Sequence, residues 1–301
     1  MSGGTGGVHV WRIEDGQRMA TIPTGGSTVY PLAMSNDGRS IAAGTIMGEV
    51  YVWDAKKYGQ LFKHKEDTNT VTGVDFSPDS TRLVSGSTNG KAIIWDTATW
   101  GQVQTLRPGA VCATKYSLQG DRIAIAISHY VRVYDSNDGR LLVNIQVAVI
   151  PYYNSGLLWF NNHLLAISDG KIKEFDASTG SAVSEWSVPE NSIQSCISQP
   201  KRGEFVAYST LNTVTFWNTS THIQLGIIQR AKDIYSIAVS RDDRFIAIGG
   251  KGQKIIIESL SRINVSTMNC QMTACLESLA HHVSHPTLTS NDKKKKSLRQ
   301  C

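Results

Sequence analysis

The sequence predicts an all-β fold, a β-propeller built from repeats of about 40 residues. The stretch "VYVWDAKKYGQ" at residues 50–60 returns 42 positions later as "AIIWDTATWGQ". Short apolar runs separated by turn residues surround each copy, and such a period with such runs is typical of propeller blades. An apolar anchor recurs at intervals of 39 to 42 residues, at Trp11, Trp53, Trp95, Tyr134, Phe175, Trp217 and Ile257.

Each repeat divides into four expected strands. Residues 71–96 give a strand, the polar turn "SPDS", a second strand, the turn "TNG" and the anchor strand, and "GQVQTL" follows as a fourth. Turn residues spaced about ten apart between β-rich runs are expected of antiparallel meanders. Inner strands such as "IAIAI" are almost continuously apolar, so neighbouring sheets must cover both of their faces. The repeats are therefore expected to stack and close into a ring.

The two ends leave the blade count open. Before the first complete repeat, "GGVHVW" and "QRMATIP" supply only the third and fourth strands of a further blade. We expect an incomplete seventh blade, as in a truncated seven-bladed propeller, rather than a six-bladed ring with an extra stub. An open ring would expose strand edges unless the C-terminal segment closes it. Six complete blades are expected, beginning near Val29, Val71, Val111, Tyr153, Ile193 and Ile234.

With these anchors, residues 7–262 resemble the WD40 repeat family. In that family an Asp follows the aromatic residue of the third strand. The sequence keeps it at Asp54, Asp96, Asp135 and Asp176 and replaces it by Arg12, Asn218 and Glu258. The family's Gly-His pair is missing from every repeat, so we expect packing rather than a buried polar network to hold the blades. We predict a propeller over residues 1–262 and a largely disordered tail over residues 263–301.

The charge is concentrated in that tail. The net charge is +5, and residues 286–301 hold five basic residues and one acid, which leaves +1 for the rest of the chain. A solvated end is the favoured interpretation, and nucleic-acid binding by the tail is the alternative. No apolar run reaches the roughly 18 residues that a membrane span needs, and the stretch "MSGGTGGVHV" lacks the basic and apolar regions expected of a signal peptide. With five scattered cysteines, the sequence favours a cytoplasmic or nuclear protein without membrane contact.

No motif supports catalysis. Residues 86–92, "GSTNGKA", imitate a phosphate-binding loop, but one residue is missing between the glycines and Ala92 replaces the hydroxyl, so we expect a β-turn. The tail's cysteines and histidines could hold zinc, but Cys275 and His281 lie too close together for finger-type spacing. We predict no enzyme activity, cofactor or metal site. The tail residues concerned are Cys270, Cys275, His281, His282 and His285.

The resemblance implies a non-enzymatic platform that presents propeller loops to proteins or peptides, acting as a monomer within a multiprotein complex. One rim is expected to offer typical interface anchors at Tyr30, Arg107, Tyr152 and Tyr235. On the opposite rim, Tyr58 and Trp100 precede the turn glycine where other repeats have small polar residues. They are candidates for a partner site, and the alternative is that each ring folds back on its own blade.

A more specific hypothesis rests on residues 41–56, "IAAGTIMGEVYVWDAK". This stretch resembles a repeat of the substrate receptors of cullin-RING ubiquitin ligases. Lys56 stands where Arg is commoner in those receptors, and no second repeat matches the pattern. A receptor function is therefore kept as an alternative to the general platform, with Lys56 as its candidate contact.

Overall fold

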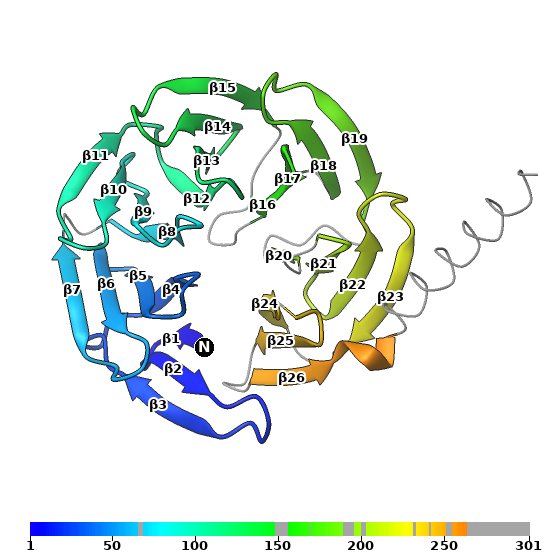
Figure 1. Ribbon diagram of the computed structural model, residues 1–301. Coiled ribbons are helices and arrows are strands. Elements are labelled where there is room, and N and C mark those ends of the chain that lie inside the picture. The colour runs from blue at the N-terminus through cyan, green and yellow to red at the C-terminus, as the bar shows by residue number, and fades with distance from the viewer. Residues whose placement is uncertain are drawn as a thin grey trace, which may run out of the picture.

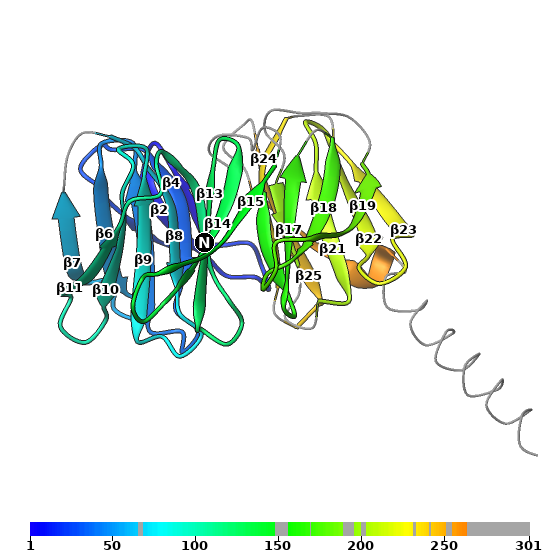
Figure 2. The ribbon, with the colours of Figure 1, turned by 90° about the horizontal axis from the view of Figure 1, so that it is seen from above.

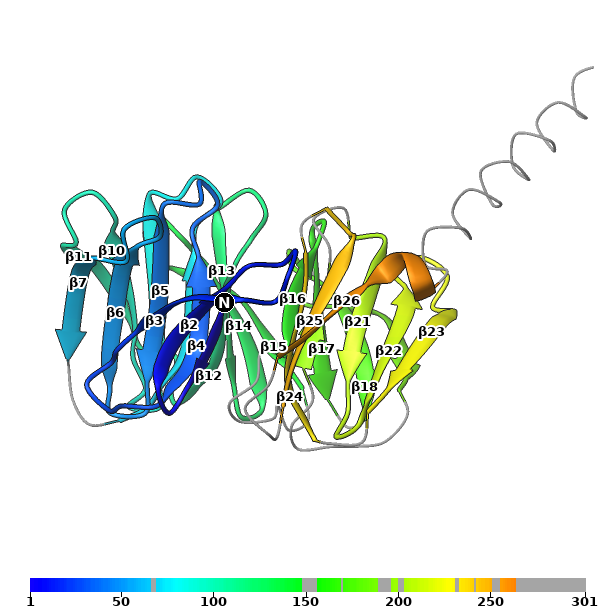
Figure 3. The ribbon, with the colours of Figure 1, turned by 90° about the horizontal axis from the view of Figure 1, so that it is seen from below.

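The computed structural model describes residues 1–65, 69–147, 156–168, 170–188, 196–199, 203–230, 233–240, 242–250 and 255–263. They form seven antiparallel sheets arranged around a centre (Figure 1). Seen from the side, the ring is a disc whose connecting turns gather along two rims (Figures 2 and 3). The all-β, seven-bladed propeller predicted from the repeats is therefore confirmed.

The first sheet has three strands, β1 (Ser2–Gly4), β2 (Gly7–Trp11) and β3 (Arg18–Ile22). Five sheets have four strands each. They are β4 (Val29–Met34), β5 (Ser40–Thr45), β6 (Glu49–Asp54) and β7 (Gln60–Lys65); β8 (Val71–Phe76), β9 (Arg82–Ser87), β10 (Ala92–Asp96) and β11 (Gln102–Leu106); β12 (Val111–Tyr116), β13 (Arg122–Ile127), β14 (Tyr130–Asp135) and β15 (Leu141–Gln146); β16 (Leu157–Phe160), β17 (His163–Ser168), β18 (Lys171–Asp176) and β19 (Ala182–Ser187); and β20 (Cys196–Ser198), β21 (Phe205–Ser209), β22 (Thr213–Asn218) and β23 (Gln224–Gln229). The last sheet has β24 (Ile234–Val239), β25 (Phe245–Gly250) and β26 (Ile255–Ser259), followed by the 3₁₀-helix η1 (Leu260–Ile263).

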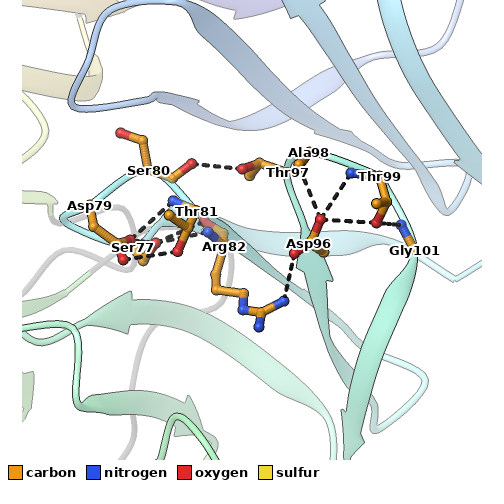
Figure 4. A network of polar contacts seen from close by, with 10 residues as sticks. All are labelled: Ser77, Asp79, Ser80, Thr81, Arg82, Asp96, Thr97, Ala98, Thr99 and Gly101. Carbon is orange, nitrogen blue, oxygen red and sulfur yellow. Dashed lines mark hydrogen bonds and ion pairs between the residues drawn. The ribbon is translucent and has the colours of Figure 1, made fainter.

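Side chains close the turns that join consecutive strands, as the third sheet illustrates (Figure 4). After β8, Asp79 accepts hydrogen bonds from the Ser77 hydroxyl at 2.6 Å and the Thr81 N–H at 3.0 Å. After β10, one oxygen of Asp96 accepts the N–H of Thr99 at 2.9 Å, and its other oxygen pairs with Arg82 at 3.0 Å. Because Asp oxygens satisfy backbone donors in this way, "SPDS" and "WDTAT" end one strand and start the next.

The turn between third and fourth strands needs an unusual backbone. The residue five positions after the anchor lies in this turn. It has a positive φ in all six sheets whose turn between third and fourth strands is among the described residues. Three sheets use glycine there and three do not, although bulky residues are uncommon at positive φ. The glycines are Gly16, Gly139 and Gly180, and the other residues are Tyr58, Trp100 and His222.

The core is divided among the interfaces between sheets. Six clusters of buried apolar residues each join one sheet to the next, from the first pair to the sixth and last. Trp53 packs toward the first sheet and Val52, its neighbour, toward the third. Alternating residues of one strand thus serve two interfaces, which explains the continuous apolar runs of the inner strands.

The ends differ in detail from the expected strand count. The first sheet contains β1 in addition to the two expected strands, and Ser2 pairs with His9. A Ser-Gly-Gly stretch carries no apolar signal, so the sequence could not show this strand. Within the described residues, the last sheet has three strands where the repeat predicts four. Tyr153 and Ile193, two expected blade starts, lie outside the described residues, as does the predicted tail beyond residue 263.

The last anchor is one residue away from its predicted position. Ile246 pairs with Glu258, as Ile41 pairs with Trp53 in the second sheet. The position of the aromatic anchor therefore falls on Glu258 and not on Ile257. Three consecutive isoleucines offer an apolar residue in any register, so spacing alone could not fix this strand.

Candidate partner-binding surface

The predicted site residues lie on the two rims of the disc. Tyr30, Arg107 and Tyr235 lie at or near the starts of first strands, on what we call the first-strand rim. Lys56 and Trp100 lie with Tyr58 in the turns that follow third strands, on the opposite, outer-turn rim. Tyr152 lies outside the described residues, so its place on the first-strand rim stays a prediction.

Irregular pairing sets the two tyrosines of the first-strand rim apart. The ladder shifts between Val29 and Leu32 in β4 and between Ile234 and Ser236 in β24, so Tyr30 and Tyr235 lie at β-bulges. A bulge redirects a side chain from the regular alternation. The two tyrosines are 47% and 42% exposed. Figure 1 shows β4 and β24 on the inner side of the ring, on either side of the first sheet.

The same irregularity in other sheets carries buried residues. The ladders of β8 and β12 also shift near their starts, at Thr72 and Cys112. Both side chains are buried, and the Thr72 hydroxyl donates to the Val111 carbonyl oxygen at 2.6 Å. Burial raises the pKa of the Cys112 thiol to about 11, so little of it is thiolate at neutral pH. The bulge therefore occurs in at least four sheets. Its residue is exposed where it is a tyrosine and buried where it is Thr72 or Cys112.

Positive charge accompanies the tyrosines on this rim. Arg107 is exposed just after β11. Arg132 donates to the carbonyl oxygen of Pro108 at 2.8 Å, and its guanidinium lies 5.8 Å from the ring centre of Tyr130. Arginine beside tyrosine is a combination that binding surfaces favour, because both side chains offer large planar contacts with a polar end.

The two aromatic residues of the outer-turn rim are half-buried. The Trp100 ring stacks on Phe62 with centroids 5.3 Å apart, and so covers the interface between the second and third sheets. Tyr58 packs against the cluster between the first and second sheets. Each ring thus packs against the preceding sheet, and not on its own blade alone as the alternative from the sequence had it. Their participation in a partner site stays a prediction.

Lys56 occupies a well-defined turn. Its side chain is exposed, and its backbone N–H donates to Asp54 at 2.9 Å, beside a second bond from Lys57. The N–H of Lys57, followed by that of Lys56, holds the pKa of the Asp54 carboxyl below its usual range. The carboxylate therefore fixes the backbone of the turn while both lysine side chains point outward to solvent.

A buried polar network in the fifth sheet was not found from the sequence. Glu174 is buried and accepts from the Ser184 hydroxyl at 2.5 Å, while its other oxygen lies 2.5 Å from His163 Nδ1. His222 stacks on Trp186 at 4.1 Å and lies 3.5 Å from the serine oxygen. The acid contacts the serine directly and not through a histidine base, so the arrangement differs from a nucleophilic triad. The available signal was Glu174 itself, an acid just before the anchor, where other repeats have Val52, Ile94 and Val133.

Metal and membrane features are absent from the part of the chain that is described. In that part, no three His, Cys, Asp or Glu side chains are grouped to hold a metal. The tail cysteines and histidines considered for zinc lie outside it. None of the described helical segments has the length and hydropathy of a membrane span.

Comparison with known proteins places this architecture. The family described as "WD domain, G-beta repeat" matches residues 56–96, which comprise the turn after β6, strand β7 and the third sheet as far as Asp96. This chain is a seven-bladed β-propeller in which residues 56–96 match a WD40 repeat. The curated proteins give no match to it. Among solved structures, one chain of the "Crystal Structure of Mitotic Checkpoint Complex" matches with a TM-score of 0.72 and 17% sequence identity, covering 83% of each chain. At that identity the likeness shows the fold alone.

The repeat anchors of this propeller have structural positions. The rings at Trp53, Trp95, Tyr134 and Phe175 are buried in third strands, and Trp11 and Trp217 are half-buried there. The following acids, Asp54, Asp96, Asp135 and Asp176, all accept backbone N–H groups of their turns. Asn218 does the same for Ser220 and Thr221. These residues need no functional explanation.

Proposed function

We propose that this WD40 propeller is a non-enzymatic interaction scaffold that presents its first-strand rim to a protein or peptide partner. The observation that carries the proposal is the pair of exposed tyrosines, Tyr30 and Tyr235, at bulges where other sheets bury the residue. Large aromatic side chains held outward on a rigid sheet are typical anchors of protein interfaces. Arg107 extends the same rim with positive charge.

The placement of the tyrosines favours one continuous contact. β4 and β24 border the first sheet on the inner side of the ring (Figure 1), so one ligand that crosses this part of the rim would meet both rings. That a chain of the same fold belongs to the mitotic checkpoint complex supports a role within a multiprotein assembly. We further propose that the chain acts as a monomer there, in the cytoplasm or nucleus.

The test is a quantitative pull-down with the tagged chain and with the double variant Tyr30→Ser, Tyr235→Ser. We expect the specific partners to fall at least about tenfold, the effect of losing a hot-spot pair, with unchanged melting temperature. The matched control is Leu141→Ser with Val183→Ser, two residues of outer strands that are similarly exposed at 46% and 51%. Equal losses in both double variants, or no loss in the tyrosine variant, would contradict the proposal.

A second candidate, a substrate receptor of a cullin-RING ubiquitin ligase, is supported by the exposure of Lys56 in a turn that Asp54 holds rigid. Binding of a ligase adaptor should then be lost in Lys56→Glu. Lys57→Glu is the matched control, because that side chain is exposed in the same turn. Failure of the adaptor to bind the unchanged chain would exclude this candidate and leave the general scaffold untouched.

A further inference from the structure

The interface between the last and first sheets is packed unlike the other six. Each of the six buried clusters lies between consecutive sheets, and among the described residues none joins β26 to the first sheet. A cleft of about 320 Å³ lies there instead. We call it the seam. It is lined by Trp11, Ile13, Glu14, Asp15, Gly16, Ile255 and Ile257.

The isoleucines of the seam occupy positions at which the other sheets bury the side chain. With Glu258 at the anchor position, Ile257 corresponds to the residue just before each anchor. That residue is at most 7% exposed in all five four-stranded sheets, at Val52, Ile94, Val133, Glu174 and Phe216. Ile257 and Ile255 are instead half-buried and face the cleft. Among the described residues, nothing gives these two aliphatic side chains the cover that the repeat provides elsewhere.

The missing cover is a strand. In each four-stranded sheet, the third strand pairs antiparallel with a fourth, as β6 does with β7. Among the described residues, no strand pairs with the outer edge of β26. In the second sheet, Phe62 of β7 lies opposite Val52 and packs on the cluster toward the third sheet. A strand at the equivalent place on β26 would direct its alternate side chains into the seam in the same way.

The residues that follow β26 disfavour the turn that leads from the third strand to the fourth strand in the other sheets. In the six other sheets the fourth strand begins seven residues after the anchor, and the fifth residue has a positive φ. That fifth residue in the last sheet is Ile263, and a β-branched residue at positive φ is a strained outlier. The chain forms η1 there instead, with Leu260 buried in the cluster between the sixth and last sheets. η1 therefore packs on the side of β26 away from the seam.

We propose that the seam binds an extended segment of a partner protein, which pairs antiparallel with β26 as the outer strand of the last sheet. Alternate apolar side chains of the segment lie against Trp11, Ile255 and Ile257, and its backbone satisfies the open edge of β26. The segment is about five residues long because β26 has five residues.

The rim of the seam selects for a basic segment. Residues 12–16 carry Arg12, Glu14 and Asp15, and Arg12 is paired with Asp15 at 3.0 Å. The turn therefore has one negative charge in excess, on Glu14. Glu258 follows Ile257 and so lies on the other face of β26, where it is paired with Arg230. A lysine or arginine beside the apolar residues of the segment would complement Glu14.

The probe is a fluorescein-labelled peptide with the sequence of residues 59–65, GQLFKHK, a basic fourth strand from the second sheet. Fluorescence anisotropy with the full chain is expected to show saturable binding at about 10 to 100 µM, and the same peptide with proline in place of phenylalanine should not bind, because proline lacks the N–H that the ladder needs. Ile257→Lys should weaken binding at least about tenfold. Ile227→Lys is the matched control, since it is 52% exposed on the outer strand β23.

Glu14→Lys serves as a second variant on an exposed side chain, so that folding of the variant is not at issue. It should weaken binding of the basic peptide by roughly threefold to tenfold. Absence of saturable binding, equal loss in Ile227→Lys, or equal binding of the proline peptide would overturn the proposal. The Tyr30 and Tyr235 variants should bind the peptide normally, so the scaffold proposal and this one fail separately.

Hydrogen exchange tests the geometry and the occupant. Amides at the outer edge of residues 255–259 should exchange rapidly in the free chain and slow down when the peptide binds. Protection in the free chain at every concentration would show that the chain covers its own edge. Protection that grows with concentration would identify a second copy as the occupant. Either result would contradict the proposal that a segment of a partner protein occupies the seam.

Discussion

Two interfaces of this propeller contain a tryptophan at the same position of the repeat, but the two tryptophans differ in how completely they are packed. Between the second and third sheets, Trp95 is buried, donates to Ser85 at 2.9 Å, and packs on the rings of Phe62 and His64 at 5.1 and 4.7 Å. Between the last and first sheets, Trp11 donates to Ser2 at 3.0 Å but is half-buried beside a cleft. Phe62 and His64 belong to a fourth strand. The repeat thus specifies the sheet, and the fourth strand of the preceding sheet completes the interface.

The largest expected effect is on Trp95. Trp95→Ala should lower the free energy of unfolding by about 3–5 kcal/mol, because it leaves a cavity in a closed interface. Urea unfolding measures it. Trp11→Ala is the control in the open interface and should cost less than half as much. Equal costs would show that the seam is as well packed as the other interface.

The contribution of the fourth strand can be separated by changing Phe62. Phe62→Ala should cost about 2 kcal/mol, less than a fully buried phenylalanine, because the ring is half-buried between Trp95 and Trp100. The neighbouring Leu61 is 47% exposed, and Leu61→Ala should change the stability by less than about 0.5 kcal/mol. Equal effects of the two changes in urea unfolding would show that Phe62 does not stabilise the interface between the second and third sheets.

A smaller effect is expected where a closed interface contains a charge. Glu174 stands where Val52 and Val133 stand in other sheets. Glu174→Val should change the free energy of unfolding by about 1 kcal/mol or less in either direction, because it removes the desolvation cost of the carboxylate together with its hydrogen bonds. Ser184→Ala, which leaves the carboxylate in place, is the comparison. A loss above about 3 kcal/mol for the valine variant would assign this network a larger role in stability.

The smallest effects concern the exposed turns and depend on pH. The N–H of Thr99, followed by its hydroxyl, holds the pKa of Asp96 below its ordinary value of 3.8. Because the folded pKa is the lower one, this stabilisation is present above pH 3.8 and is lost as the pH falls through the folded pKa. Asp96→Asn should keep the turn, since Asn218 accepts the same two N–H bonds in the sixth sheet.

The measurement compares the urea midpoint of the Asp96→Asn variant and the unchanged chain at neutral pH and below pH 3.8. The two chains should differ less at the acidic pH than at neutral pH. An unchanged difference across this range would show that the carboxylate contributes no charge-dependent stability to its turn.

Periodic features of the sequence predicted most of the architecture, because anchors such as Trp53 and turn acids such as Asp54 recur wherever a sheet must pack on two neighbours. Structural features that occur only once in the chain could not be predicted from the repeat pattern. β1 has no apolar residue, the register of β26 is ambiguous among three isoleucines, and Glu174 meets partners on the two strands beside it, whose register its own strand does not reveal. The exposure of Tyr30 and Tyr235 was expected from their positions on the rim, but the bulges that redirect them depend on pairing that no single strand reveals.

The six clusters between sheets also describe how the molecule should come apart. Each cluster couples only two neighbouring sheets, so the described residues are expected to behave as a linear array of units with nearest-neighbour coupling rather than as a closed cycle. Within the part of the chain that the structure describes, the first and last sheets each have one neighbour joined by a buried cluster, and the sheets between them have two. Fraying therefore begins at both ends of the array and moves inward, and a ligand that bridges those ends would convert the array into a cooperative circle.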